Sequence, residues 1–146
     1  MGQITLPASG SSLYLDAAPV IYSVERHADY WALMLPVWAA AKRGECEIVT
    51  SELTLLETLV MPLKRNAANL IAAYENLLTA SDVRLLPVTQ AVLREAAVLR
   101  ATTNLKTPDA IHAASAMAAG CALFVTNDGD LRRVGGLNVA VLKDLI

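Results

Sequence analysis

The sequence contains few aromatic residues, few cysteines and no excess of basic residues. Aromatic side chains make up 5% of the 146 residues, although hydrophobic residues make up 55%. Much of the hydrophobic content is alanine and leucine, which favours packed helices. The formal net charge of −2 gives no overall basic character of the kind that indicates nucleic-acid binding. The length and a mean hydropathy of +0.43 predict one folded domain with one core.

The sequence has two cysteines, Cys46 and Cys121, and they form no CxxC pair. Neither a disulfide framework nor a zinc site is therefore predicted, which is consistent with a reducing, cytoplasmic compartment. The first twelve residues contain neither the basic segment nor the apolar segment of a secretory signal peptide. The longest apolar runs, at residues 30–41 and 113–125, are too short to span a bilayer. We expect a soluble protein with no membrane contact.

Short apolar segments alternate with helical segments after an expected leader at residues 1–12. The predicted strands are 13–15, 47–50, 83–86, 122–125 and 139–142. The predicted helices are 19–26, 30–43, 52–60, 63–80, 89–102 and 108–118, followed by a helical turn at 128–133. Short strands separated by helices form parallel sheets that are covered on both faces. We therefore expect a single α/β domain at residues 13–146, with a mostly parallel central sheet flanked by helices.

Residues 106–120, KTPDAIHAASAMAAG, predict a helix that is buried almost all round. Thr107 is expected to cap the helix, with Pro108 at the first helical position. Gly120 is expected to end it. Asp109 then lies in the first turn, where the helix dipole favours a negative charge. A carboxylate is thus predicted at the N-terminus of a buried helix.

Three further acidic residues are predicted to lie near Asp109. Asp16 ends the first strand and Asp128 follows the fourth, and sites in open α/β sheets form beyond the carboxyl ends of the strands. Glu57 lies about 9 Å along the helix that follows the second strand, at about 1.5 Å per residue. Of the four acids, it is therefore the one whose closeness to the others is least directly predicted. Clustered carboxylates raise one another's pKa values. Mg²⁺ or Mn²⁺ would relieve that repulsion, and two such ions would support an in-line phosphoryl displacement.

Four segments, in order along the chain, resemble the four motifs of PIN domains, the fold of VapC-type toxins. They are LDAAPVIY at 15–22, TSELTLLE at 50–57, KTPDAIHAA at 106–114 and VTNDGDL at 125–131. The resemblance implies a PIN-like three-layer α/β fold. It implies a Mg²⁺- or Mn²⁺-dependent endoribonuclease that hydrolyses RNA phosphodiester bonds by metal-activated water. It further implies the toxin of a type II toxin–antitoxin pair, with a cognate antitoxin and a homodimeric state.

Matched residue by residue, the resemblance assigns the catalytic, metal-binding acids as Asp16, Glu57, Asp109 and Asp128. Glu52 is a rival for the second position, but the family spacing favours Glu57. Asp130 stands beside the fourth motif as a possible additional acid. Leu131 occupies a position where the family often has an aromatic residue, which we interpret as a change in packing.

Two other groups of residues leave alternatives open. His112 lies one turn after Asp109 and is interpreted as a packed residue with one hydrogen bond, although it could face the same site. Trp31, Leu35 and Trp38 form a helical stripe. Core packing is one interpretation of this stripe, and an interface with a second subunit or an antitoxin is the other.

Other chemistries lack their residues, because the sequence contains no GxxxxGK[ST], HExxH or GxSxG motif. A PIN-like module without catalytic activity, which would bind RNA or protein, is the alternative to the ribonuclease. Metal-dependent RNA cleavage separates the two.

Overall fold

The computed structural model describes residues 2–146, and its sheet has five parallel strands in the order β3-β2-β1-β4-β5. The strands are β1 Ser11–Leu15, β2 Cys46–Ser51, β3 Val83–Leu86, β4 Leu123–Thr126 and β5 Val139–Val141. The predicted α/β class with a parallel sheet is confirmed. The first strand of the chain lies at the centre of the sheet, between β2 and β4.

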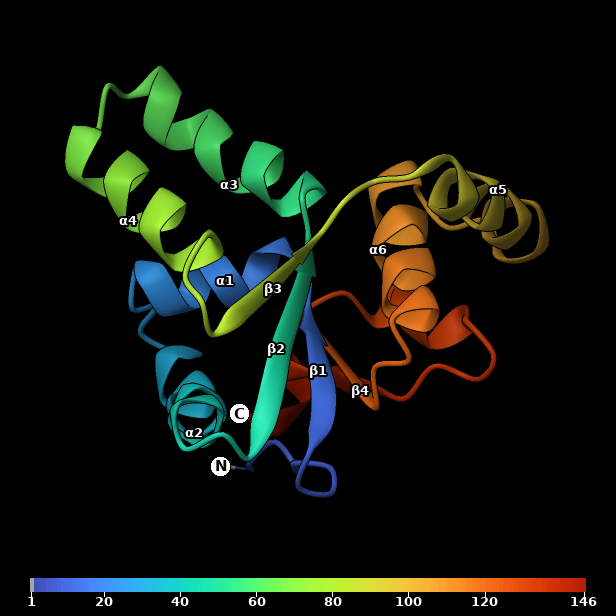
Figure 1. The fold of residues 1–146 in the computed structure, drawn as a ribbon, viewed down its shortest axis with the longest axis horizontal. Helices are drawn as coiled ribbons and strands as arrows, with labels where there is room; N and C mark the ends of the chain where they lie inside the picture. The colour runs from blue at the N-terminus through green and yellow to red at the C-terminus, as the bar shows by residue number, and fades with distance from the viewer. Residues whose placement is uncertain (1) are drawn as a thin grey trace.

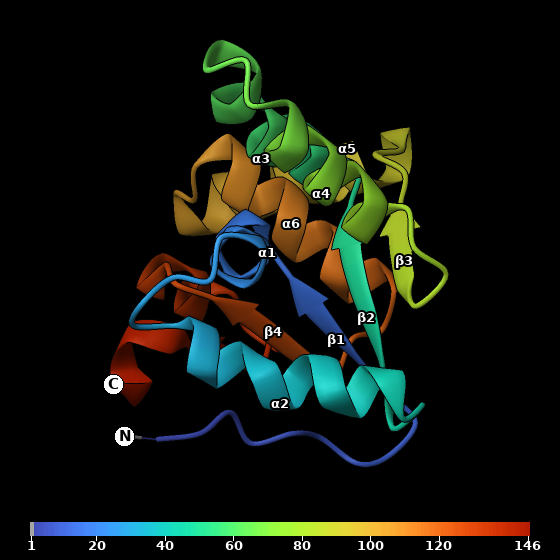
Figure 2. The same ribbon diagram turned by 90° about the vertical axis from the view of Figure 1, so that its left-hand side faces the viewer.

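Pairs of helices connect β1 to β2, β2 to β3 and β3 to β4. The helices are α1 Ala17–Val24, α2 Trp31–Lys42, α3 Leu53–Lys64, α4 Ala68–Leu78, α5 Gln90–Thr103 and α6 Thr107–Ala118, and the short 3-10 helices are η1 Gly129–Arg133 and η2 Leu142–Leu145. The chain moves outward from β1 to β3 and then returns to β4 on the other side of β1. Because parallel crossovers are right-handed, this reversal places α5 and α6 on the opposite face of the sheet from α1, α2 and α4 (Figures 1 and 2).

The two faces of the sheet have different cores. Leu13 and Leu15 of β1 pack with α1, α2 and α4, whereas Tyr14, between them, packs with α5 and α6, as the alternation of side chains along a strand requires. Alanines of α6 supply much of the second core, and their small side chains let the helix lie close to the sheet. The predicted burial of this helix is confirmed in its middle, at residues 110–116, whereas Thr107, Pro108, Met117 and Ala118 are exposed.

Helix α3 is longer than the sequence predicted, because it continues through Pro62 to Lys64. A proline lacks the N–H for one helical hydrogen bond, and this loss near the last turn does not stop the helix. The break occurs at Asn66, whose φ of 51° is in the left-handed region, and the N–H of Ala67 then bonds to the carbonyl of Pro62 at 2.9 Å. The prediction of a helix over 63–80 was therefore wrong at its start.

Side-chain hydrogen bonds stabilise the starts of two helices, and of the two ends predicted for the helix at 106–120 one is confirmed and one is wrong. The Thr89 side chain accepts a hydrogen bond from the N–H of Val92, and the hydroxyl of Ser51 accepts from that of Leu53 at 3.0 Å. Gly120, at a φ of +67°, follows the end of α6. Thr107 is the first residue of α6 rather than its cap, and its hydroxyl makes no capping bond.

The aromatic stripe of α2 is divided between the core and the surface. Trp31 and Trp38 are partly buried against the first core, and the indole N–H of Trp38 donates to the hydroxyl of Ser23 at 2.8 Å. Leu35 is 47% exposed. The first core also contacts the N-terminal segment through Ile4 and Leu6.

Within residues 2–146, no helix is both long enough and apolar enough to cross a membrane.

Candidate active site

A cavity of about 430 Å³ opens at the carboxyl ends of β1 and β4. These neighbouring strands are followed by connections that run in opposite directions, and such a reversal is where ligands bind in open α/β sheets. The cavity is lined by the four predicted acids, Asp16, Glu57, Asp109 and Asp128, together with Ala17, Ala18, Ile21, Tyr22, His112, Thr126 and Asn127. The structure therefore brings together acidic residues that are up to 112 positions apart in the printed sequence.

Asp16 lies at the centre of this arrangement, directly after β1. Its side chain is 7% exposed, and its Oδ2 accepts a hydrogen bond of 2.5 Å from the buried hydroxyl of Thr126 at the end of β4. The same Thr126 hydroxyl accepts a bond of 3.1 Å from the N–H of Asp128. The other oxygen, Oδ1, is buried and has no hydrogen-bond partner among residues 2–146. A buried carboxylate oxygen without a partner is costly, so Asp16 has one oxygen fixed and one available.

Burial is the main reason that the pKa of Asp16 is raised from 3.8 to about 7. The negative charges of Asp109 and Glu57 raise it further, while His112 and the hydrogen bond from Thr126 oppose the rise. The protein environment thus disfavours the charged carboxylate that a cation would require.

Asp109 and Asp128 approach the cavity from two other elements. Asp109 lies in the first turn of α6, as predicted, and Asp128 caps η1 by accepting a hydrogen bond of 2.9 Å from the N–H of Asp130. Burial, followed by the neighbouring carboxylate of Asp128, raises the pKa of Asp109 to about 6. Like charges therefore meet at this side of the cavity.

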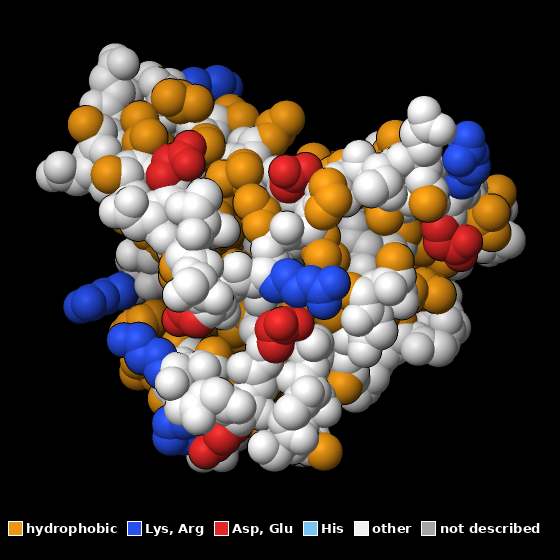
Figure 3. Space-filling view, viewed as in Figure 1, with side chains coloured by type: hydrophobic (Ala, Val, Ile, Leu, Met, Phe, Trp, Pro, Cys, Tyr) orange, Lys and Arg blue, Asp and Glu red, His pale blue; other side chains and the backbone are white. Residues whose placement is uncertain are grey.

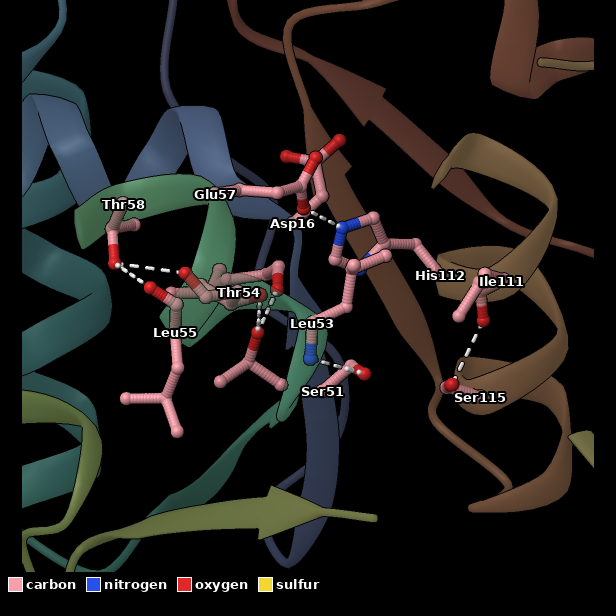
Figure 4. Close-up of polar contacts among 12 residues, drawn as sticks. Asp16, Ser51, Leu53, Thr54, Leu55, Glu57, Thr58, Ile111, His112 and Ser115 are labelled. Carbon is pink, nitrogen blue, oxygen red and sulfur yellow. Dashed lines mark hydrogen bonds and ion pairs between the residues drawn. The ribbon is translucent and has the colours of Figure 1, made fainter. Parts of the chain in front are cut away.

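Glu57 reaches the cavity from the second turn of α3 and is held there by His112 of α6. Its Oε1 lies 2.5 Å from Nε2 of His112, and Nδ1 of the same ring lies 2.6 Å from the hydroxyl of Tyr14 in β1. Figure 4 shows Glu57 and His112 pointing toward one another from their two helices. The interpretation of His112 as a packed residue with one hydrogen bond is corrected, since the ring has two partners and lines the cavity.

A second set of hydrogen bonds fixes the start of α3, from which Glu57 projects. The hydroxyl of Thr50, near the end of β2, donates to the carbonyl of Leu15 at 2.6 Å and lies 2.7 Å from the hydroxyl of Thr54. Both threonines are buried. The first turn of α3 is thereby tied to β1 at the residue before Asp16, which explains how an acid so far along a helix lies beside the strand ends.

Several residues of the cavity were not singled out by the sequence. Thr126, Tyr22 and Asn127 line it, and the amide of Asn127 donates to the hydroxyl of Tyr22 at 3.0 Å. The available signal was the Thr-Asn-Asp tripeptide at the end of an apolar strand. Asp130 does not line the cavity and pairs with Arg133 at 3.2 Å, and Glu52 is exposed.

The chemistry of these side chains fits a divalent cation. Carboxylates supply hard oxygen ligands, and the unpartnered Oδ1 of Asp16 and the crowded Asp109 and Asp128 are groups that a cation would stabilise. Among residues 2–146, no three His, Cys, Asp or Glu side chains are already arranged as a metal-binding group.

The chain belongs to the PIN-domain family, whose model matches residues 13–137. Its fold is that of VapC-type toxins. The structure of VapBC2 from Rickettsia felis, bound to a promoter DNA fragment, is similar at 18% identity and a TM-score of 0.73, covering 89% of this chain and 98% of that one.

Two further solved structures share this fold. VapC20 of Mycobacterium tuberculosis, a toxin that cleaves the sarcin–ricin loop, matches at 18% identity and a TM-score of 0.71, covering 84% of this chain and 95% of that one. A toxin–antitoxin complex from Klebsiella pneumoniae matches at 20% identity and a TM-score of 0.65, covering 90% and 97% respectively. A search of curated protein sequences finds no match.

Proposed function

We propose that this PIN domain is a Mg²⁺- or Mn²⁺-dependent endoribonuclease that acts as the toxin of a type II toxin–antitoxin pair. The observation that carries the proposal is the convergence of four acids on one cavity, with a buried oxygen of Asp16 left without a partner. Membership of the PIN-domain family and the VapC-type fold support the same activity. We propose that residues 13–146 form the single domain and that the protein acts in the cytoplasm. The expected leader at residues 1–12 overlaps β1 at Ser11 and Ser12 and contacts the first core through Ile4 and Leu6.

The cation would be held by Asp16, Glu57, Asp109 and Asp128. When bound, it supplies activation of water and neutralisation of charge on the phosphate. Thr126 keeps Oδ2 of Asp16 occupied, which directs Oδ1 to the cation. Both ring nitrogens of His112 already have partners, so this histidine orients Glu57 rather than exchanging a proton with RNA.

Two surface features support the proposed partners. Hydrophobic side chains gather over α3 and α4 in Figure 3, where Leu56 is 63% exposed and Leu63 is 58% exposed. Exposed apolar patches mark protein interfaces, and we propose that α3 contributes to a homodimer. The half-buried Trp31 and Trp38 line a separate groove with residues of α1 and α4, which we propose as a contact of the cognate antitoxin.

The function is tested by incubating the purified protein with structured RNA, with and without Mg²⁺ or Mn²⁺. We expect cleavage that EDTA abolishes. Asp16→Asn is expected to reduce the rate by about 10³-fold, since metal catalysis contributes several kcal/mol to the barrier. Undiminished cleavage in excess EDTA would exclude the metal mechanism, and RNA binding without cleavage in either metal would favour the module without catalytic activity.

A further inference from the structure

A chain of hydrogen bonds runs from the central strand to the cavity through Tyr14, His112 and Glu57. We propose that Tyr14 and His112 are positioning residues that determine which oxygen of Glu57 faces the cation. The inference rests on the proposed function, because it explains how the Glu57 carboxylate is oriented to bind the proposed metal.

The chain connects three elements that are distant in sequence. Tyr14 belongs to β1, His112 to α6 and Glu57 to α3, and the two contacts measure 2.6 and 2.5 Å. Tyr14 is completely buried, and the side chain of His112 is 2% exposed, whereas that of Glu57 is 26% exposed. The interior members are therefore fixed by packing, and only the carboxylate at the end of the chain meets the cavity.

The chemistry of the three groups assigns the direction of the hydrogen bonds. Burial raises the pKa of Tyr14 and keeps the phenol protonated, so its hydroxyl can donate to Nδ1. When the phenol donates to Nδ1, the ring proton lies on Nε2, which donates to Oε1 of Glu57. The opposite tautomer would place the lone pair of Nε2 against a carboxylate oxygen at 2.5 Å, which is repulsive.

This direction has a consequence for the carboxylate. Oε1 of Glu57 is occupied by His112, and Oε2 remains for the cavity. A glutamate side chain loses conformational entropy when it is fixed. The chain holds Glu57 before the cation arrives, as hydrogen bonds to a metal ligand from outside the coordination sphere do in other sites.

The first test measures the tautomer of His112 in the intact, metal-free protein by ¹⁵N NMR. We expect the tautomer with the proton on Nε2, and we expect Tyr14→Phe to reduce its population. Tyr74→Phe is the matched control, because Tyr74 is also a completely buried tyrosine whose hydroxyl donates to a glutamate, Glu25. A wild-type proton on Nδ1, or a tautomer that Tyr14→Phe leaves unchanged, would overturn the proposal.

The second test measures Mn²⁺ affinity by electron paramagnetic resonance. We expect Tyr14→Phe to weaken binding by about 10-fold, while Tyr74→Phe does not weaken it. In His112→Asn, the shorter amide side chain can still accept from Tyr14 but no longer donates to Glu57, whereas the longer amide of His112→Gln can still donate to Glu57. His112→Asn should therefore weaken Mn²⁺ binding more than His112→Gln. Melting in EDTA shows whether each variant is folded. Equal Mn²⁺ affinities for Tyr14→Phe and Tyr74→Phe would contradict the positioning role.

Failure of the proposed function gives a different pattern. If the wild type cleaves no RNA while the tautomer and Mn²⁺ effects are as expected, the ribonuclease activity is wrong and the positioning chain stands. If the wild type cleaves RNA while Tyr14→Phe changes neither the tautomer nor Mn²⁺ binding, the ribonuclease stands and the chain is only structural.

Discussion

The two sides of the cavity differ in how their carboxylates are held. On one side, Glu57 is bonded to His112, which is bonded in turn to Tyr14. On the other side, Asp109 and Asp128 face each other as like charges, and burial and this repulsion raise the pKa of Asp109 to about 6. The charges of both Asp109 and Glu57 act on Asp16, which has one oxygen bonded to Thr126 and the other without a partner in the described residues.

The difference shows how one cavity combines fixed and responsive ligands. The side with Glu57 has its geometry set by protein hydrogen bonds before any cation binds. The side with Asp109 and Asp128 holds unfavourable charge that a cation would neutralise. Sites that store such unfavourable interactions trade stability for activity, and the following predictions measure that trade on each part of the cavity.

The largest expected effect is a loss of stability in the metal-free protein as pH rises. The pKa of Asp16 is raised from 3.8 to about 7, so its contribution is fully present below pH 3.8 and is lost as pH rises through 7, a change of about 4 kcal/mol. The measurement is urea unfolding in EDTA from pH 4 to pH 8, for the wild type and for Asp16→Asn. The variant should lack this decrease. A wild type that loses no more stability than Asp16→Asn over this range would contradict the assignment.

The next prediction tests whether Asp109 binds metal or is only a structural residue of the helix. Asp109→Asn should be more stable than the wild type in EDTA, because one of two facing charges is removed. Metal should stabilise the wild type by about 2.7 kcal/mol at a hundredfold excess over its dissociation constant, and the variant much less. Thermal melts with EDTA and with Mn²⁺ measure both quantities. If the variant melts well below the wild type in EDTA and gains equally from metal, Asp109 only supports the helix.

Thr126 tests the bonded oxygen of Asp16. Thr126→Val has nearly the same shape but cannot donate to Oδ2, and the loss should cost about 1–3 kcal/mol. Thr126→Ser retains the hydroxyl and is the matched control. Urea unfolding at pH 8 in EDTA compares them, and equal stability of the Val and Ser variants would show that the hydrogen bond contributes little.

The smallest expected effect is that of Asp130→Asn, an acid outside the cavity. Asp130 pairs with Arg133 at an exposed position, and exposed pairs contribute little, so stability should change by less than about 0.5 kcal/mol. Its Mn²⁺ stabilisation and RNA cleavage should equal those of the wild type. A loss of metal stabilisation comparable to that of Asp109→Asn would place Asp130 in the site after all.

The sequence predicted the acids that follow strands better than the contacts that orient them. Asp16 and Asp128 could be placed because strands are short, apolar and end at one edge of a parallel sheet. The place of Glu57 depends on Thr50 and His112, which reach α3 from β2 and α6. Such side-chain contacts depend on tertiary packing, and no local pattern contains them.

The ends of the helices likewise could not be predicted from local sequence. The predicted break between the helices at 52–60 and 63–80 falls at Pro62, which lacks an N–H, whereas the chain turns at Asn66, where the backbone becomes left-handed. Pro62 removes one helical hydrogen bond, and α3 still continues past it while packing against α4. Periodicity predicted that helices are present here, and only the folded structure shows where one ends and the next begins.

The pairing of β1 with β4 also has a consequence for the order in which the protein is made. Leu13 pairs with Leu123, so the central pairing joins the two ends of the chain, and contacts so distant in sequence form slowly. During synthesis the first strand has no neighbour on that side until β4 has left the ribosome. The cavity accordingly cannot form early in synthesis, because a nascent chain carries its acids apart until residue 128 has been added.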